Sequence, residues 1–259
     1  MKLISLNTWG GKLYKPLMEF VESEAKTTDV FCFQELYFSK TPRPDIPWIR
    51  ANLAFELQSL LSDFLMFERL GDRKSDVSGE LPDRDVKIGE AIFVKKPITV
   101  IESGGFRTYS ENDESAKERI KNISGNFHFV EFEKTGESYF IGNVHGIWIP
   151  GPKIDSSGRI EQSNRLNNEL KKRSGKEILC GDFNLKPETE SVAILGSGMR
   201  NLIKEYGIKT TRNRYYPDME KYGDYIADYA FASPNVQIGD FKVPMNEISD
   251  HLPLILEFS

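Results

Sequence analysis

The sequence predicts an α/β protein in which antiparallel strands outnumber parallel ones. A strand–helix–strand pattern opens the chain and returns loosely in the second half, and such a unit makes its two strands parallel neighbours. Between the two units, strand-like runs follow one another without a helix, as in an antiparallel sheet. No linker or composition shift divides the 259 residues, so we expect a single domain over residues 1–259.

The first unit starts at the second residue of the chain. Lys2–Thr8 has the alternation of a strand, and Asp29–Gln34 is a continuous apolar run typical of a buried strand. Parallel pairing brings the ends of these strands, with Asn7 and Glu35, to one edge. The connecting segment opens at Pro16 and has apolar residues at helical spacing: Leu17, Phe20, Val21 and Ala25.

The middle of the chain predicts one helix and four strands. The helix is indicated by an apolar face formed by Leu53, Leu57, Leu60, Leu61 and Phe64. The strand-like runs are Ala91–Lys95, Ile98–Glu102, Phe127–Glu133 and Ser138–Val144. The four residues from Lys134 to Glu137 are typical of a hairpin turn.

The second unit repeats the first in outline. A strand ending in GNVHG leads to a polar helix at Arg159–Lys172, for which Gly175 is the expected C-cap, and then to the strand EILCGDFN. Asn143 and Asp182 would correspond to Asn7 and Glu35. If the halves pack sheet against sheet, these strand ends converge on one rim, where ligands commonly bind. The remaining expected elements are a helix at Glu188–Leu195 and strands at Ala227–Ala232 and Leu252–Phe258.

The charge balance limits the classes of partner. A formal net charge of −5 disfavours a protein that grips long nucleic acid through a broadly basic surface. A nuclease remains open, because an enzyme needs only a local basic lining. Basic residues in loop-like segments could supply that lining or be ordinary solvated charges: Arg73, Lys74, Arg84, Lys117, Arg119, Arg212 and Arg214. No P-loop or GxGxxG motif supports nucleotide-cofactor chemistry.

Location is predicted from three features. The N-terminal MKLISLNTWG is a strand pattern rather than a signal peptide, and no run approaches the roughly 18 apolar residues of a membrane span. Cys32 and Cys180 lie in buried-looking strands, so we expect reduced core thiols rather than a disulfide, metal ligands or nucleophiles. We therefore expect a cytoplasmic protein with no membrane partner, and a monomer.

Four acidic residues interrupt or end apolar runs: Glu35, Asp182, Asp228 and Asp250. A lone acid is usually solvated, but an ionised carboxylate in such a run is unfavourable unless it meets a metal, a histidine or several donors. Four together indicate a site. Oxygen ligands from Asp, Glu and Asn suit Mg²⁺, with Mn²⁺ as the alternative, far better than zinc.

Histidines and asparagines add to this set. Of the three histidines, His145 ends a strand and His251 precedes one in SDH, whereas His128 alternates along the strand FHFVEF and is expected to be structural. Asn7 and Asn184 also stand at strand ends, although an asparagine there is more often a turn or cap residue.

The motifs LNTWG, CFQE, GNVHG, CGDFN, IADYAF and SDH occur in the order and spacing of the endonuclease/exonuclease/phosphatase superfamily, which this chain resembles from Lys2 to Phe258. The resemblance implies a four-layer sandwich: two mixed, mainly antiparallel β-sheets face to face, flanked by helices, as in deoxyribonuclease I. It also implies a metal-dependent phosphoesterase with its site at one end of the sandwich.

The resemblance implies roles residue by residue. Glu35 resembles the principal metal ligand, with Asn7 and Asp250 as further metal or water ligands. Asp182 resembles the residue that orients or deprotonates the attacking water, and Asn184 one that donates to a phosphate oxygen. Asp228 would hold His251 through a hydrogen bond, so that His251 can contact the scissile phosphate.

The branch is less sharply indicated. His145 matches the deoxyribonuclease I, sphingomyelinase and inositol-phosphatase branches, and Glu90 resembles the glutamate that pairs with this histidine in deoxyribonuclease I, with a surface role as the alternative. The segment GRIEQSNRL is similar to intracellular members, including the tyrosyl-DNA phosphodiesterase branch. Trp9, Trp148 and Tyr109 are candidates for stacking on a base or sugar, or for the core.

These features predict a Mg²⁺-dependent phosphodiesterase whose partner is a phosphate ester, with DNA, RNA or a nucleotide-like molecule preferred. The close alternative is a phosphomonoesterase acting on an inositol phosphate or another small metabolite. A catalytically inactive binding module on the same fold is the remote alternative.

Overall fold

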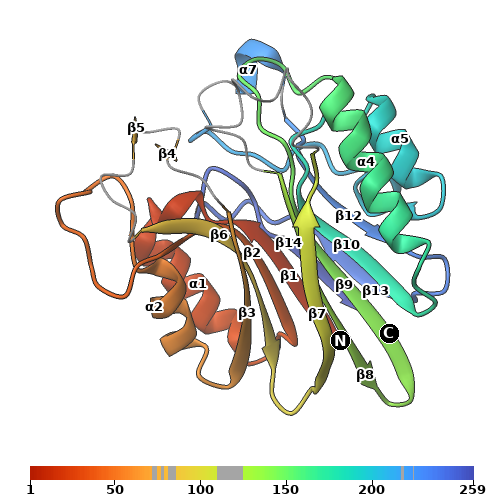
Figure 1. Cartoon of the computed structure of the whole chain (residues 1–259), viewed down its shortest axis with the longest axis horizontal. Helices are drawn as coiled ribbons and strands as arrows, with labels where there is room; N and C mark the ends of the chain where they lie inside the picture. The colour runs from red at the N-terminus through yellow and green to blue at the C-terminus, as the bar shows by residue number, and fades with distance from the viewer. Residues whose placement is uncertain (72–74, 77–78, 81–85, 110–124, 217–218, 224) are drawn as a thin grey trace.

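The computed structural model describes the whole chain except residues 72–74, 77–78, 81–85, 110–124, 217–218 and 224. Two six-stranded sheets dominate it (Figure 1). Sheet 1 has the order β13 (Ile238–Lys242), β14 (Leu254–Phe258), β1 (Lys2–Asn7), β2 (Val30–Phe38), β6 (Lys87–Lys95), β3 (Phe64–Leu70). Sheet 2 has the order β11 (Arg200–Asn201), β12 (Asp228–Ala232), β10 (Lys176–Asp182), β9 (Glu137–His145), β8 (Asn126–Lys134), β7 (Val100–Arg107).

Helices cover the outer face of each sheet. Helices α1 (Tyr14–Ala25) and α2 (Leu53–Leu60) lie on sheet 1, and α4 (Ser157–Leu170) and α5 (Glu190–Gly196) lie on sheet 2 (Figure 1). The smaller elements are η1 (Trp9–Gly11), β4 (Ser75–Asp76), β5 (Gly79–Glu80), α6 (Leu202–Glu205) and α7 (Met219–Tyr222). The predicted four-layer sandwich of two mixed sheets is therefore confirmed. In the described part of the chain, no helix is long and apolar enough to cross a membrane.

Both predicted strand–helix–strand units are present. Strands β1 and β2 pair in parallel through α1, and β9 and β10 pair in parallel through α4. All other strand pairs in the two sheets are antiparallel. The order β14-β1-β2-β6 in sheet 1 matches β8-β9-β10-β12 in sheet 2, with the parallel pair in the centre of each. The strand ends that carry the predicted site residues therefore occupy equivalent positions in two similar sheets.

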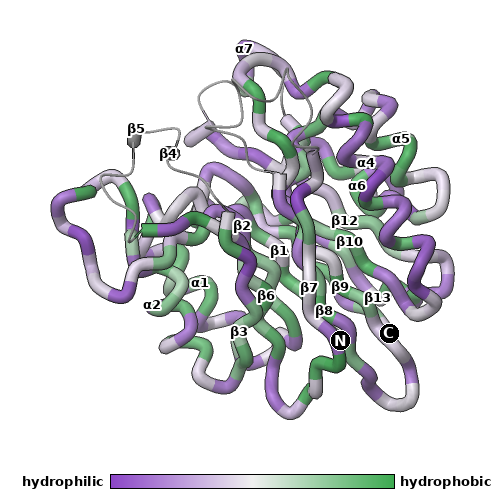
Figure 2. The backbone as a smooth tube through the Cα atoms, in the orientation of Figure 1, coloured by the Kyte–Doolittle hydropathy of each residue, from purple (hydrophilic) through white to green (hydrophobic). Residues whose placement is uncertain are grey.

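Apolar side chains fill three interfaces. One cluster packs α1 and α2 against the outer face of sheet 1, and a larger one fills the space between the sheets and the outer face of sheet 2. Hydrophobic residues accordingly concentrate along the central strands (Figure 2). Cys32 and Cys180 are buried and free, and their thiols contact one another across the two sheets, where burial raises the pKa of Cys32. The prediction that both cysteines lie in the core is confirmed.

Several boundaries differ from the prediction. Helix α2 ends at Leu60 and Phe64 begins β3, because the apolar residues of this edge strand continue in phase with the helix face. Strand β7 is shifted towards the C-terminus of the expected run. Gly175 is not a helix cap: α4 ends at Leu170 with Lys171 as its C-cap. Gly175 instead lies so close to the backbone of Ser138 that a Cβ atom would be 2.7 Å from its carbonyl oxygen.

The expected hairpin turn between β8 and β9 is confirmed, with Thr135 and Gly136 both at positive φ. Asn143 is a correction. It lies two residues before the end of β9, fully buried between the sheets, and does not reach the rim. Its Oδ1 accepts from Gln34 Nε2 at 2.6 Å, and its Nδ2 donates to Phe33 O at 3.1 Å. Asn143 therefore joins the two sheets and is not the counterpart of Asn7 in a site.

Candidate active site

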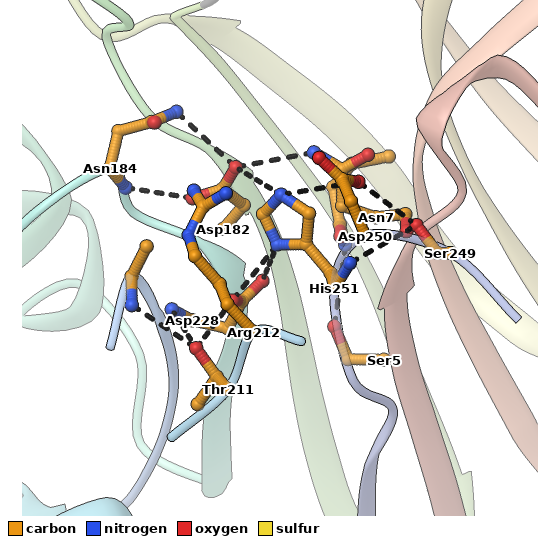
Figure 3. A network of polar contacts seen from close by, with 12 residues as sticks. Ser5, Asn7, Asp182, Asn184, Thr211, Arg212, Asp228, Ser249, Asp250 and His251 are labelled. Carbon is orange, nitrogen blue, oxygen red and sulfur yellow. Dashed lines mark hydrogen bonds and ion pairs between the residues drawn. The ribbon is translucent and has the colours of Figure 1, made fainter. Parts of the chain in front are cut away.

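The nine residues predicted to form a site lie at one end of the sandwich, and the topology explains why. Parallel pairing aligns the C-terminal ends of β1 with β2 and of β9 with β10, and His145 stands directly opposite Asp182. Strand β12 runs antiparallel to β10, so its first residue, Asp228, faces Asp182. The loop before β14 adds Asp250 and His251 (Figure 3).

The backbone at two of these positions is unusual. Glu35 has φ 56° and sits where the pairing of β2 with β6 shifts register, and Asn184 also has φ 56°. This left-handed conformation is unfavourable by roughly 1–2 kcal/mol for residues other than glycine. At Glu35 the bulge leaves the side chain 23% exposed in a strand that is otherwise almost entirely buried. Such local strain is typical of functional positions.

His251 is held by a carboxylate. Its Nδ1 lies 2.9 Å from Asp228 Oδ1, and Asp228 Oδ2 accepts from the hydroxyl of Thr211 at 2.7 Å. This arrangement leaves Nε2 facing Asp182 Oδ2 at 3.7 Å (Figure 3). Burial and the charge of Arg212 both favour the neutral ring, but the surrounding carboxylates outweigh them and raise the pKa of His251 to about 9. A pKa in this range favours the cationic ring at neutral pH.

Asp182 is the centre of the hydrogen-bond network. Its Oδ1 accepts from the backbone N–H of Asn184 at 2.9 Å, and its Oδ2 accepts from Asn7 Nδ2 at 3.2 Å. Burial alone would raise the pKa of Asp182, but the charges of His251 and Arg212 hold it below its usual value. Asp182 is therefore an ionised carboxylate able to accept a proton.

A second histidine, opposite Asp182 in the register of β9 and β10, has carboxylate partners of its own. His145 Nδ1 is 2.9 Å from Glu90 Oε1, and Nε2 is 3.5 Å from Glu35 Oε1. Burial lowers the pKa of His145, but the hydrogen bond and charge of Glu90 outweigh it, and the net pKa is raised. Glu90 is only 2% exposed, so the alternative of a surface role for Glu90 is wrong. Glu90 Oε2 has no hydrogen-bond partner among the described residues.

The oxygen ligands expected for a metal fit a divalent cation. Glu35, Asn7 and Asp250 offer the hard oxygen atoms that Mg²⁺ and Mn²⁺ prefer. Burial, followed by the charge of Glu35, raises the pKa of Asp250 despite opposing charges from His251 and Arg212. A cation bound between Glu35 and Asp250 would remove this repulsion.

A second group could also hold a metal by distance alone. Ligand atoms of Asp182, Asp228 and His251 lie within 4.8 Å of one another, and all three residues are buried. In this group, however, His251 Nδ1 is already engaged by Asp228, whose carboxylate also accepts from Thr211. The sequence, by contrast, predicts the metal on the Glu35 side.

Four further residues complete the site, and of these only Arg212 was named from the sequence, as one of several loop cations. Ser249 donates to the backbone carbonyl of Asn7 at 2.7 Å, and Thr211 donates to Asp228. Lys153 is 1% exposed, and its charge helps to lower the pKa of Asp182. Arg212 is 2% exposed, although the sequence suggested only a loop cation. The burial of Arg212 could not be predicted from the sequence, because a Thr-Thr-Arg run between strands has no hydrophobic pattern and its position depends on how the loop folds.

Of the remaining aromatic and basic candidates, some border the site and others do not. Trp9 donates its backbone N–H to Asn7 Oδ1 at 3.0 Å and lies 6.4 Å, ring to ring, from Tyr215, so it borders the site. The ring of Trp148 lies under Lys153, whereas Tyr109 is buried. Arg214 is exposed and paired with Glu247. The other loop cations lie outside the described residues: Arg73, Lys74, Arg84, Lys117 and Arg119.

Comparison with known proteins gives a consistent result. The model of a family described as Endonuclease/Exonuclease/phosphatase matches residues 4–251. A search of curated proteins found no significant match. Among solved structures, a family protein from Leptotrichia buccalis has a TM-score of 0.71 at 18% identity, covering 100% of this chain and 99% of its own.

Two other solved structures carry more specific descriptions. The mannosyl-6-phosphatase Bt3783 of Bacteroides thetaiotaomicron has a TM-score of 0.66 at 17% identity, covering 100% of this chain and 99% of its own. The D. rerio TDP2, complexed with single-strand DNA product, has a TM-score of 0.68 at 16% identity, covering 100% and 98%. Identities this low show a shared fold and do not identify a substrate.

Proposed function

Because the chain belongs to the endonuclease/exonuclease/phosphatase family, we propose that it is a Mg²⁺-dependent phosphodiesterase acting on DNA, RNA or a nucleotide-like substrate. The observation that carries the proposal is the pair of opposite charges at the rim: cationic His251, held by Asp228, faces the ionised carboxylate of Asp182. A phosphate ester needs a base for the attacking water and a donor for the phosphate oxygens, and this pair supplies both.

In the proposed reaction, Asp182 orients a water molecule and accepts one of its protons. The water oxygen forms the new bond to phosphorus as the ester P–O bond breaks, and the leaving oxygen takes a proton from solvent. His251 donates from Nε2 to a non-bridging oxygen, because Asp228 fixes Nδ1. Asn184, next to Asp182, donates to a second phosphate oxygen, and Glu90 keeps His145 oriented towards Glu35.

Glu35, with Asn7 and Asp250, would hold the metal. When bound there, Mg²⁺ or Mn²⁺ neutralises phosphoryl charge and lowers the pKa of a bound water. The bulge at Glu35 supports this assignment, because it turns a carboxylate out of a buried strand towards the rim.

A phosphomonoesterase is the second candidate, and one observation favours it. Lys153 and Arg212 add two buried cations near Asp182, and a monoester carries more negative charge than a diester. The fold is compatible with both substrates, because its solved relatives include a mannosyl-6-phosphatase and a protein with single-strand DNA product. An inactive binding module has the least support, since charged groups suited to each chemical step are present. The acidic net charge and free buried thiols support a cytoplasmic monomer.

The test is an assay with Mg²⁺, with Mn²⁺ and with EDTA. The substrates are bis(p-nitrophenyl) phosphate, p-nitrophenyl phosphate, single- and double-stranded DNA, RNA and inositol phosphates. We expect metal-dependent cleavage that Glu35→Ala and His251→Ala each lower by about 10²- to 10⁴-fold. His128→Asn, which changes a histidine away from the rim, serves as the matched control. Cleavage confined to phosphomonoesters would overturn the diesterase assignment, and a folded protein inactive on every substrate would overturn hydrolysis.

A further inference from the structure

Arg212 is a buried cation without an ion-pair partner among the described residues. Its side chain is 2% exposed, and its Nε has no hydrogen-bond partner among the described residues. None of the described carboxylates forms an ion pair with it within 4.0 Å. Burying an uncompensated charge is strongly unfavourable, and a buried counter-ion is expected to make direct, well-aligned contacts with its acid. Arg212 makes no such direct contact with a described acid.

The guanidinium is nevertheless held in a fixed place. Its Cζ lies 3.7 Å from the centre of the Tyr216 ring, which is a close cation–π contact. Its backbone pairs with that of His251 in an isolated β-bridge, and its N–H donates to Thr210 Oγ1. The guanidinium end lies beside the His251 ring and points towards Asp182 (Figure 3). Stacking therefore holds the cation at the rim, where Nε has no hydrogen-bond partner in the part of the chain that the structure describes.

The charges around Arg212 keep it ionised. Burial would lower the pKa of Arg212, but Asp182, Asp228 and nearby groups raise it above its usual value. The same guanidinium lowers the pKa of both Asp182 and His251, so the group acts on the two residues that would handle the proton and the phosphate.

We propose that Arg212 is a further substrate-binding residue, whose guanidinium donates hydrogen bonds to non-bridging oxygens of the scissile phosphate. The ligand it selects is a phosphoryl group, because the planar guanidinium presents parallel donors that match two phosphate oxygens. Arg212 and His251 then bind the phosphate from adjacent positions, and Tyr216 holds Arg212 in place. This inference rests on the proposed function, since it assigns a residue to the same site.

The chain offers a matched control two residues away. Arg214 also lies over a tyrosine, with its Cζ 5.3 Å from the centre of the Tyr215 ring. Unlike Arg212, it is exposed and its Nη2 is 2.7 Å from Glu247 Oε2. Replacing Arg214 therefore removes one positive charge and one contact with a tyrosine, as replacing Arg212 does, but it removes no side chain from the rim.

The experiment compares Arg212→Gln, Arg212→Lys and Arg214→Gln with the unmodified chain. Isothermal titration calorimetry with inorganic phosphate measures Kd, and steady-state kinetics measure kcat and KM. We expect Arg212→Gln to weaken phosphate binding by about 10- to 100-fold, the range of one charge-assisted contact. It should also lower kcat/KM by about 10²- to 10³-fold. Arg212→Lys should fall in between, because it keeps the charge without the fork, and Arg214→Gln should match the unmodified chain.

The outcomes separate this proposal from the proposed function. If Arg212→Gln binds phosphate as well as the unmodified chain, Arg212 is only a distant counter-ion and the proposal is overturned. If Arg212→Gln does not fold, Arg212→Lys decides, since a substrate-binding role predicts weaker phosphate binding at an unchanged melting temperature. If the unmodified chain hydrolyses no ester yet binds phosphate through Arg212, hydrolysis fails and the assignment of Arg212 stands.

Discussion

The rim of the sandwich and the space between its sheets use the same residue types in opposite ways. At the rim, His145 and His251 each have a carboxylate partner at 2.9 Å, and the pKa of each is raised. Between the sheets, His128 Nδ1 has no hydrogen-bond partner among the residues that the structure describes, and burial together with the charge of Arg69 lowers the pKa of His128 to about 4. Asparagine divides similarly, because Asn7 contacts Asp182 whereas Asn143 ties sheet to sheet.

The difference shows that position along a strand, rather than residue type, decides the role. A polar side chain at the end of a strand can contact loops that connect to the other sheet, and several charged side chains lie close to it. One or two residues earlier, the same group faces the opposing sheet and must be satisfied by its backbone or left neutral. The following predictions test this division, beginning with the largest effect.

The largest effect is expected at the rim. Asp182→Asn removes the charge that faces His251 but keeps the shape, so we expect kcat to fall by about 10²- to 10⁴-fold. The melting temperature should fall, because the pKa of Asp182 is lowered in the folded chain and its charge therefore stabilises the fold. Activity assays and thermal unfolding check both, with the half-exposed Asp240→Asn as control. A large loss of stability with little loss of activity would break the comparison, since it would make Asp182 a structural residue.

The second effect concerns pH and lies between the sheets. His128 has a pKa of about 4 in the folded chain, whereas it titrates near 6.5 when unfolded. Between these values the unfolded chain binds the additional proton, so stability rises with pH there and is lost as pH falls from about 6.5 to 4. The maximum contribution is about 3 kcal/mol. His128→Asn should unfold with a shallower pH dependence in chemical denaturation, and an unchanged dependence would contradict the assigned pKa.

The smallest effect compares the two asparagines directly. Asn143→Ala removes the hydrogen bonds between the sheets, so we expect a loss of about 1–3 kcal/mol in the free energy of unfolding. The melting temperature should fall by about 2–4 °C for each kcal/mol, while kcat well below that temperature stays unchanged. Asn7→Ala should show the reverse, with lower activity and a smaller loss of stability. Equal behaviour of the two variants would remove the distinction.

Much of the fold could be predicted, because it depends on patterns of residues that are close together in the sequence. The two parallel units and the hairpin at Thr135 follow from apolar runs and turn residues. Strand β3 was missed because Phe64 continues the apolar face of α2, so periodicity could not locate the break. Gly175 was misread as a cap because its reason for being glycine is the backbone of Ser138, which is distant in sequence.

The candidate site could be predicted where residues end strands. Parallel pairing brings Asn7 and Glu35 to one edge of the first sheet, and His145 and Asp182 to one edge of the second. The resemblance supplied the roles. Thr211 was not identified and Arg212 was predicted only as one of several loop cations, because their position depends on a loop folding against the residues before β14. Asn143 was expected at the rim as the counterpart of Asn7, although it lies two residues before the end of its strand and faces the other sheet.

The left-handed backbone at Glu35 and Asn184 has a consequence for engineering. A design procedure that rewards favourable backbone conformations would replace both residues with glycine, and the resulting chain would tolerate heat better. It would also lose a carboxylate and an amide from the rim. Selection for thermal tolerance alone would therefore drift towards an inert scaffold, and libraries built on this fold should keep these two codons fixed.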